Sequence, residues 1–249
     1  MEKTEAQNEI TSGSHESTQT AEAKAHHYDA SKYDRPSVTV DVVMMSLRQR
    51  DLQVLLVKRR SWPYEGMWAI PGGFVNMDES LETAAKRELQ EETGVQDVYL
   101  EQLYTFGQPD RDPAGRVVSV AYFALIHAAG ITLHTQSKYA DVRWWPCATL
   151  PQLAYDHDTV AAYARQRLEW KLAYTNVVWS LLPHRFALTE LQKVYEAVLG
   201  RKLDKRNFRK KILALGLVEP VGETAMHGAH RPAMLYRFTS REPRLIDML

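Results

Sequence analysis

Three glutamates lie close together in the stretch RELQEETG, at Glu88, Glu91 and Glu92. Apolar residues recur at helical spacing through this stretch, which predicts a helix with the three carboxylates on one face. Like charges at that spacing destabilise a helix unless a cation neutralises them. Carboxylate oxygens suit Mg²⁺ or Mn²⁺, ions that polarise phosphoryl oxygens and activate water. A solvated acidic helix face is the alternative interpretation of the same charges.

Neighbouring residues are of the types that such a metal site needs. Arg87 precedes the first glutamate and can orient a carboxylate through a bidentate pair. Gly72 and Gly73 permit close approach of the backbone, so a main-chain carbonyl there can serve as a further oxygen ligand. The pattern therefore favours metal-dependent chemistry on a phosphate compound.

The full spacing around the glutamates is more specific than the acidic cluster alone. From Gly73 the sequence runs through five residues to Glu79, through seven more to Arg87–Leu89, and then to Glu91–Glu92 and Gly94–Val95. This arrangement resembles the signature box of the Nudix family, with every defined position filled. The resemblance implies a hydrolase fold for nucleoside diphosphates linked to another group, with Mg²⁺ or Mn²⁺ as cofactor.

The resemblance also implies roles for individual residues. It assigns metal binding to the carbonyl of Gly72 and to the side chains of Glu88, Glu91 and Glu92. It assigns catalysis to Glu91 and Glu92, with Glu91 a further ligand or a base, and to Arg87, which would hold a glutamate in place.

The segment GQPDRDPAGRVVSVAYFAL resembles Nudix proteins that recognise ADP-ribose. Arg111 and Arg116 in this segment are candidate clamps for phosphate or ribose, because a guanidinium matches phosphate bidentately. Arg59 is a third candidate, Gly73 offers backbone approach, and Trp68 could stack on adenine. Solvated loop charges and core packing are the alternatives for the arginines and the tryptophan.

A later segment, LHTQSKYADVRWW, departs from the resemblance. ADP-ribose hydrolases of this family often take a catalytic base from a late loop, and here Asp141 is the only acid and Glu is absent. The sequence therefore predicts ADP-ribose binding, and hydrolysis to AMP and ribose 5-phosphate depends on a base that this loop does not obviously supply.

The elements that must position these residues follow from apolar patterning. The runs SVTVDVVMMSL and LQVLLVKRR, separated by polar RQRD, predict two strands joined by a turn. Asp78 or Ser80 can cap the acidic helix, and Gly94 can end it. Further strands and the box indicate an α+β protein, a Nudix α/β/α sandwich with a mixed sheet, followed by a winged helix-turn-helix domain.

The domain organisation is predicted from changes in composition. Residues 1–35 are polar and predict a disordered tail, and residues 36–154 form the Nudix domain. Residues 155–182 are expected to be a connecting helix, and this segment includes a helical run from His157 to Leu181 that contains neither Gly nor Pro. Residues 183–249 complete the winged helix domain.

A strongly basic segment lies in the last of these regions. Between Arg201 and Arg241 there are ten Lys or Arg against three Asp or Glu. Phosphate neutralisation by such a patch supplies affinity for double-stranded DNA, and a residue near the start of a recognition helix can read a base edge. A solvated basic face is the alternative. The predicted DNA contacts are Lys202, Lys205, Arg206, Asn207, Arg209, Lys210 and Arg231.

The phrases YDHDTVAAYARQRLEWKLAYT and LGRKLDKRNFRKKILALGLVEPVGE resemble the Nudix-related transcriptional regulators of NAD metabolism. This resemblance implies a homodimer that binds DNA and whose Nudix domain senses ADP-ribose. Binding of ADP-ribose would release the DNA from the dimer. The competing hypothesis is a dedicated Nudix pyrophosphatase in which the C-terminal module serves only dimerisation, through the helix from His157 to Leu181.

Charge, cysteine content and the lengths of apolar runs indicate the cellular compartment of the protein. The chain of 249 residues carries no net charge and a single cysteine, so a disulfide framework within one chain is excluded. Its first residues have no apolar stretch typical of a secretory signal, and no apolar run is long enough to cross a bilayer. These features predict a cytoplasmic protein without a membrane partner.

Overall fold

The computed structural model describes residues 29–94, 98–127, 131, 133, 136–225 and 232–248. Contacts divide the chain into two compact units, Met1–Pro36 and Ser37–Leu249. In the first unit the described residues are mostly exposed and include one turn of 3₁₀ helix, η1 (Ala30–Lys32). Most of the predicted disordered tail, residues 1–28, lies outside the described residues.

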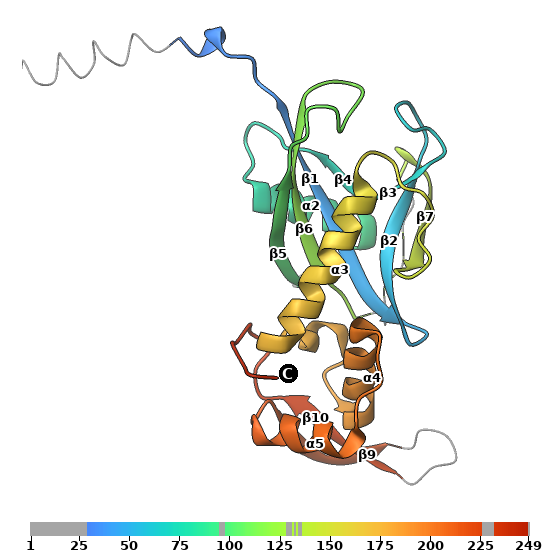
Figure 1. The fold of residues 1–249 in the computed structure, drawn as a ribbon, viewed down its shortest axis with the longest axis vertical. Coiled ribbons are helices and arrows are strands. Elements are labelled where there is room, and N and C mark those ends of the chain that lie inside the picture. Colours follow the sequence, from blue (N-terminus) through green and yellow to red (C-terminus); the bar gives the residue numbers. More distant parts are fainter. Residues whose placement is uncertain are drawn as a thin grey trace, which may run out of the picture. The chain divides into compact units, whose positions relative to one another are not determined.

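The second unit opens with a seven-stranded mixed sheet (Figure 1). Its strands are β1 (Ser37–Arg48), β2 (Asp51–Arg59), β3 (Trp68–Ala69), β4 (Gly72–Phe74), β5 (Tyr99–Phe106), β6 (Val117–Leu125) and β7 (Tyr139–Pro146). The central strand, β1, pairs in parallel with β6 and antiparallel with β2 and β4. The strand order is β3-β2-β1-β6-β5, and β7 pairs with β2.

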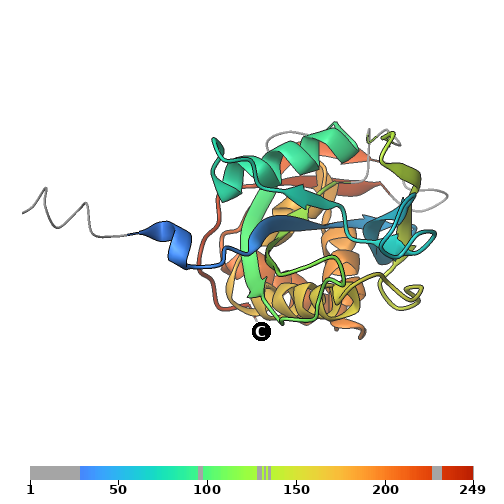
Figure 2. The same cartoon turned by 90° about the horizontal axis from the view of Figure 1, so that it is seen from above.

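Two helices cover opposite faces of this sheet, α2 (Leu81–Thr93) and α3 (His157–Tyr174) (Figure 2). Because side chains alternate along a strand, β1 supplies both cores. Val42 and Met44 pack in the core under α2, whereas Val43 and Met45 pack in the core under α3. The continuous apolar run of β1 is thus the pattern of a strand buried on both faces, and the predicted sandwich is confirmed.

The ends of α2 are fixed by local chemistry. The Ser80 hydroxyl accepts a hydrogen bond from Thr83 N at 3.1 Å, so Ser80 is the N-cap. Gly94 adopts the left-handed conformation, with φ of +67°, and its N–H donates to Gln90 O at 2.7 Å. A residue without Cβ adopts this φ without strain, so the helix ends where the sequence predicted.

The predicted continuous helix from His157 to Leu181 is wrong in its last third. α3 ends at Tyr174, and Thr175 is extended. The interruption is set by tertiary pairing, because Thr175 and the Asn176 side chain form backbone contacts with residues 242–245. Thr and Asn are weak helix formers, so little helical stability opposes this pairing.

A small winged helix domain follows. Three strands form an antiparallel sheet in the order β8-β10-β9, which packs with the two helices of the domain. This arrangement confirms the predicted winged helix-turn-helix. Its elements are η2 (Val177–Leu181), β8 (Phe186–Ala187), α4 (Leu188–Leu199), α5 (Lys205–Ala214), β9 (Val218–Ala225) and β10 (Ala233–Phe238).

One hydrophobic core joins the two domains within the second unit. Leu168 and Leu172 of α3 belong to the same cluster of buried side chains as Leu191 and Tyr195 of α4. α3 therefore packs on the Nudix sheet along one part of its length and on the winged helix domain at its C-terminal end, as Figure 1 shows. Among the described residues, no helix is long and apolar enough to cross a membrane.

Candidate nucleotide site and basic helix

The acidic face of α2 is held together by Arg87. The guanidinium donates to Glu79 at 2.8 and 3.2 Å and to Glu88 Oε1 at 2.7 Å. This guanidinium lowers the pKa of Glu79 to about 2 and ties the loop before α2 to the helix. Arg87 therefore positions Glu88, which is almost fully buried.

The glycines before α2 lie directly against this cluster. A Cβ added to Gly73 would overlap the Glu88 carboxylate, and one added to Gly72 would overlap the backbone of β1. The Gly72 carbonyl accepts a hydrogen bond from the Tyr139 hydroxyl at 3.5 Å. Only glycine permits this approach of strand β4 to the carboxylate, which explains the Pro-Gly-Gly sequence before the box.

Glu92 is the least satisfied of the three glutamates. Its side chain is fully buried, and in the described part of the chain neither carboxylate oxygen has a hydrogen-bond partner. Burial, followed by the neighbouring carboxylates Glu88 and Glu91, raises the pKa of Glu92 to about 7, against the opposing effect of Lys138. A buried carboxylate without donors is a position that a cation would stabilise.

Lys138, on the turn before β7, reaches this position. Its Nζ lies 3.0 Å from Glu88 Oε2, 3.8 Å from Glu92 Oε1 and 3.9 Å from Glu91 Oε2. Nothing in the spacing of the sequence indicated this contact, because Lys138 is 46 to 50 positions from the glutamates and looks like any loop lysine.

The donor set fits a hard divalent cation in part. All candidate ligands are oxygens, and the orphaned oxygens of Glu92 call for positive charge. However, no group of three or more His, Cys, Asp or Glu side chains converges as a preformed metal cage within the ranges that the structure describes. A cation here would draw further ligands from water or from substrate phosphate, as Mg²⁺ commonly does.

A cavity opens beside Gly72 and Gly73. Three predicted substrate residues line it, Arg59, Gly73 and Arg111, together with Tyr155 and His157, which the sequence analysis did not single out. Arg59 lies over the Tyr155 ring at 5.0 Å and donates to a backbone carbonyl at 2.6 Å, so this guanidinium is oriented before any ligand arrives.

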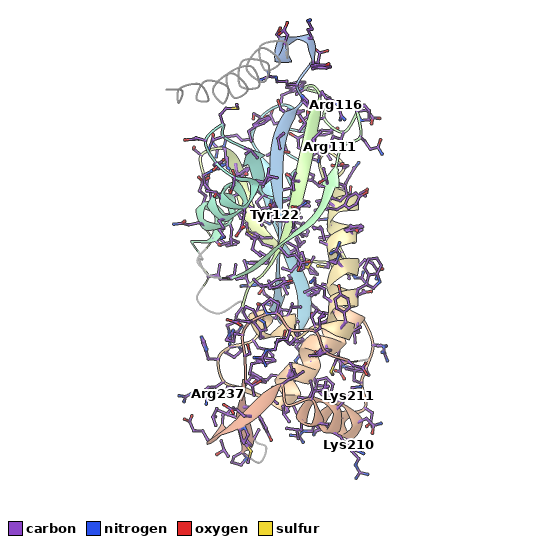
Figure 3. The ribbon with its side chains drawn as sticks, turned by 90° about the vertical axis from the view of Figure 1, so that its left-hand side faces the viewer. Arg111, Arg116, Tyr122, Lys210, Lys211 and Arg237 are labelled. Carbon is purple, nitrogen blue, oxygen red and sulfur yellow. The ribbon has the colours of Figure 1, made fainter. Side chains whose placement is uncertain are left out.

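Two predicted substrate residues do not line this cavity. Trp68 packs edge-to-face against Trp145, with centroids 5.3 Å apart, beside the core on the α3 side of the sheet. Arg116 donates to the carbonyls of Gly107 and Gln108 at 2.9 and 3.3 Å, which braces the loop between β5 and β6. Figure 3 shows Arg116 near the end of the sheet, beyond Arg111.

Arg111 is buried beneath the cavity in a network of charged side chains. Its guanidinium makes a bidentate pair with Asp156 at 2.6 and 3.1 Å and lies 3.5 Å from Asp41. His157 Nδ1 accepts a hydrogen bond from Ile70 N at 2.9 Å, and burial lowers the pKa of His157. Because Asp156 is the N-cap residue of α3, the floor of the cavity is tied to the helix that reaches the winged helix domain.

The basic helix α5 presents its charges outward. Phe208 and Ile212 are buried, and Asp204 caps the helix by accepting from Asn207 N at 2.8 Å. Lys210 and Lys211 project at the end of the unit away from Arg111 (Figure 3). Four of the predicted contacts are exposed and have no ion-pair partner among the described residues: Lys205, Arg206, Arg209 and Lys210.

Two other predicted DNA contacts stand differently. Lys202 is exposed and lies 3.3 Å from Glu196, so its charge is partly matched. Arg231 lies outside the described residues.

Comparison with known proteins agrees with both halves of this architecture. Residues 36–167 match the NUDIX domain, and residues 178–238 match the NrtR DNA-binding winged helix domain. The chain belongs to the Nudix family, in the branch whose members carry this winged helix domain.

Individual relatives resemble the chain over different lengths. The "ADPR responsive transcriptional repressor NtrR" of Acinetobacter baylyi is 39% identical over 232 residues, which is 88% of this chain and 91% of that protein. An "ADP-ribose pyrophosphatase" of Methanocaldococcus jannaschii is 33% identical over 139 residues, 56% of this chain and 77% of that protein. The Nudix domain is thus related to ADP-ribose pyrophosphatases.

NrtR of Shewanella oneidensis resembles the chain in two solved structures. Its complex with a 27mer DNA superposes with a TM-score of 0.72 at 38% identity, over 81% of this chain and 93% of the other. Its isolated Nudix domain, complexed with ADP ribose, superposes with a TM-score of 0.52 at 40% identity, over 59% of this chain and 97% of the other.

Proposed function

We propose that this protein is a transcriptional repressor that binds double-stranded DNA through α5 and the hairpin of strands β9 and β10, and that ADP-ribose bound in the Nudix cavity releases the DNA. The observation that carries this proposal is the similarity to the A. baylyi repressor, because it extends over both domains. The S. oneidensis structures, one with DNA and one with ADP ribose, support the same two ligands.

The cavity offers the chemistry that a nucleoside diphosphate needs. Arg59 and Arg111 supply guanidinium groups, and the backbone of Gly72–Gly73 allows phosphate oxygens to come close. Tyr155 offers an aromatic face for a base or ribose. When Mg²⁺ or Mn²⁺ is bound by the box carboxylates, it supplies a Lewis acid that polarises phosphoryl oxygens for hydrolysis.

The route from ligand to DNA runs through the start of α3. Arg111 is neutralised by its ion pair with Asp156. A diphosphate that attracts Arg111 weakens its pair with Asp156, and this changes the support for the first turn of α3. Since α3 shares a core with α4, a shift of α3 alters the placement of α5 on DNA.

The test measures DNA binding with and without ligand. Fluorescence anisotropy is recorded with a duplex from the region upstream of the protein's own gene, and with ADP-ribose titrated into the complex. Release of this duplex by ADP-ribose, but not by AMP plus ribose 5-phosphate, is the expected result. A duplex bound equally tightly at saturating ADP-ribose contradicts the proposal.

A second activity is favoured by the complete box: Mg²⁺-dependent hydrolysis of ADP-ribose to AMP and ribose 5-phosphate. Its support is that Glu88, Glu91 and Glu92 of α2 all lie within 4 Å of one point, Lys138 Nζ, and that Gly73 packs against the Glu88 carboxylate. Turnover is compared between wild type and Glu91→Gln or Glu92→Gln. If wild type is as inert as both variants, the enzymatic proposal fails and the sensing role is unaffected.

Dimerisation is a separate proposal, carried over from the likeness to NAD-metabolism regulators. Sedimentation equilibrium of the full chain is expected to give twice the monomer mass. A dedicated pyrophosphatase would show turnover without any DNA binding. Binding of the duplex in the anisotropy measurement would therefore contradict that alternative.

A further inference from the structure

The cationic side chains near the box pair unequally with the three glutamates Glu88, Glu91 and Glu92. In the described part of the chain, Arg87 is engaged by Glu79 and by one oxygen of Glu88, and it lies 3.8 Å from Glu91. The ion pair that reaches Glu92 among these residues comes from Lys138.

Burial makes this ion pair necessary. Glu88 and Glu92 are 1% and 0% exposed, and they are four residues apart on one helix. Two buried like charges at that spacing are strongly destabilising unless a cation accompanies them. Within the ranges that the structure describes, Lys138 is the side chain whose ammonium lies within 4 Å of all three glutamates, so it provides this cation from within the chain.

The loop that carries Lys138 is fastened to the box. Gln136 Nε2 donates to Glu91 Oε2 at 3.3 Å, and Gln136 O accepts from Tyr139 N at 3.0 Å to close the turn. Lys138 Nζ also lies 5.0 Å from the centroid of the Tyr139 ring. The ammonium is therefore positioned by its turn and by an aromatic face, in addition to the carboxylates.

We propose that Lys138 is a built-in counter-ion that takes the place of a divalent cation at the box and lowers the affinity of the site for metal. A metal ion must displace the ammonium from Glu88 Oε2 and from the edge of Glu92 before it can bind both. An ammonium neutralises charge and can donate hydrogen bonds to phosphate, but unlike a metal ion it does not coordinate a water and generate a nucleophile from it. The site thereby favours holding a diphosphate over cutting it, a consequence that rests on the proposed ADP-ribose sensing.

Metal affinity tests this directly, because it needs neither nucleotide nor turnover. Mn²⁺ alone is titrated calorimetrically into full-length wild type, Lys138→Gln and the matched control Lys86→Gln. Lys86 lies on the same helix as the glutamates but pairs with Glu82 on the exposed side, so its removal changes the net charge equally. Removal of a unit charge within 4 Å of the site is expected to tighten Mn²⁺ binding roughly tenfold or more in Lys138→Gln.

The outcomes separate this inference from the proposed function. Mn²⁺ binding to Lys138→Gln that is no tighter than to wild type or to Lys86→Gln overturns the role of Lys138. Lys138→Met is a second variant for the same Mn²⁺ titration. A third measurement uses wild type alone and compares its affinity for ADP-ribose in EDTA and in Mg²⁺. Wild type is expected to bind ADP-ribose in EDTA with nearly the affinity seen in Mg²⁺.

Loss of ADP-ribose binding in EDTA, with binding intact in Mg²⁺, overturns the inference even if both variants fail to fold. Absence of ADP-ribose binding under both conditions overturns the proposed function instead, and the Mn²⁺ titration still decides the role of Lys138.

Discussion

The pair between Arg111 and Asp156 offers a quantitative test of how the cavity is joined to α3. The Arg111 side chain is 4% exposed, and Asp156 receives two of its N–H groups. Replacing Asp156 with Ala leaves a buried guanidinium with the longer contact to Asp41, at 3.5 Å. Breaking a buried pair by removing one partner typically costs about 3–5 kcal/mol.

The expected loss lies at or just below the lower limit of that range, because Asp156 is 22% exposed and Asp41 remains. We therefore expect Asp156→Ala to reduce the free energy of unfolding by about 2–3 kcal/mol. For a folded unit of this size, that corresponds to a fall in melting temperature of roughly 4–12 °C. Urea unfolding followed by far-UV circular dichroism measures the first quantity, and calorimetry the second.

A control and a double variant make the test specific. Arg185→Ala removes an exposed pair with Glu223 at 2.7 Å and is expected to cost less than about 1 kcal/mol. Arg111→Met combined with Asp156→Leu removes both charges and is expected to cost less than the sum of the single changes. If Asp156→Ala is no more destabilising than Arg185→Ala, the buried network does not support α3 and the proposed route from ligand to DNA loses its basis.

Three further predictions address pH, DNA and helix termination. Burial lowers the pKa of His157, so the unfolded chain binds more protons near pH 6, and stability is lost as pH falls below about 6.5. His157→Asn should flatten this part of the plot of unfolding free energy against pH. The raised pKa of Glu92 has the opposite effect on stability, but Glu92 is present in both proteins, so its contribution cancels when the variant is compared with wild type. An unchanged profile would count against a neutral buried His157. Arg209→Ala should weaken DNA binding and should lower the slope of log binding constant against log salt concentration by about 0.9 for each phosphate that the variant no longer neutralises. Arg165→Ala on α3 is the control and should leave this slope unchanged. Equal slopes for the two variants would show that Arg209 does not contact DNA. Gly94→Ala should cost about 1 kcal/mol in urea unfolding, because φ is +67° and a Cβ there meets nothing within 4 Å; a cost above about 3 kcal/mol would reveal a clash that the structure does not contain.

Much of the site was predictable because the information lies within short segments. The spacing of Glu88, Glu91 and Glu92 fixes their common face as soon as the segment is helical. Ser80 and Gly94 set the ends of that helix through contacts with residues three or four positions away. Arg59, Gly73 and Arg111, which the sequence analysis named as substrate-binding candidates, line one cavity in the structure, and their binding roles stay predictions.

Other features were not predictable from local pattern. Trp68 was proposed to stack on adenine, but the strand that carries it turns its ring toward Trp145. The end of α3 at Tyr174 was missed because the competing partner is a segment about 70 residues later in the chain. Neither helix propensity nor the absence of Gly and Pro reports such a distant contact.

The sequence by itself determined which chemistry is present: a helix with three carboxylates, two glycines beside it, and a basic helix capped by Asp204. Only the tertiary structure decided which charges meet. Arg111 finds Asp156 across 45 positions, and Lys138 finds Glu88 across 50. Helical periodicity and capping act over one or two turns, whereas ion pairs across a sheet depend on how the whole sandwich closes.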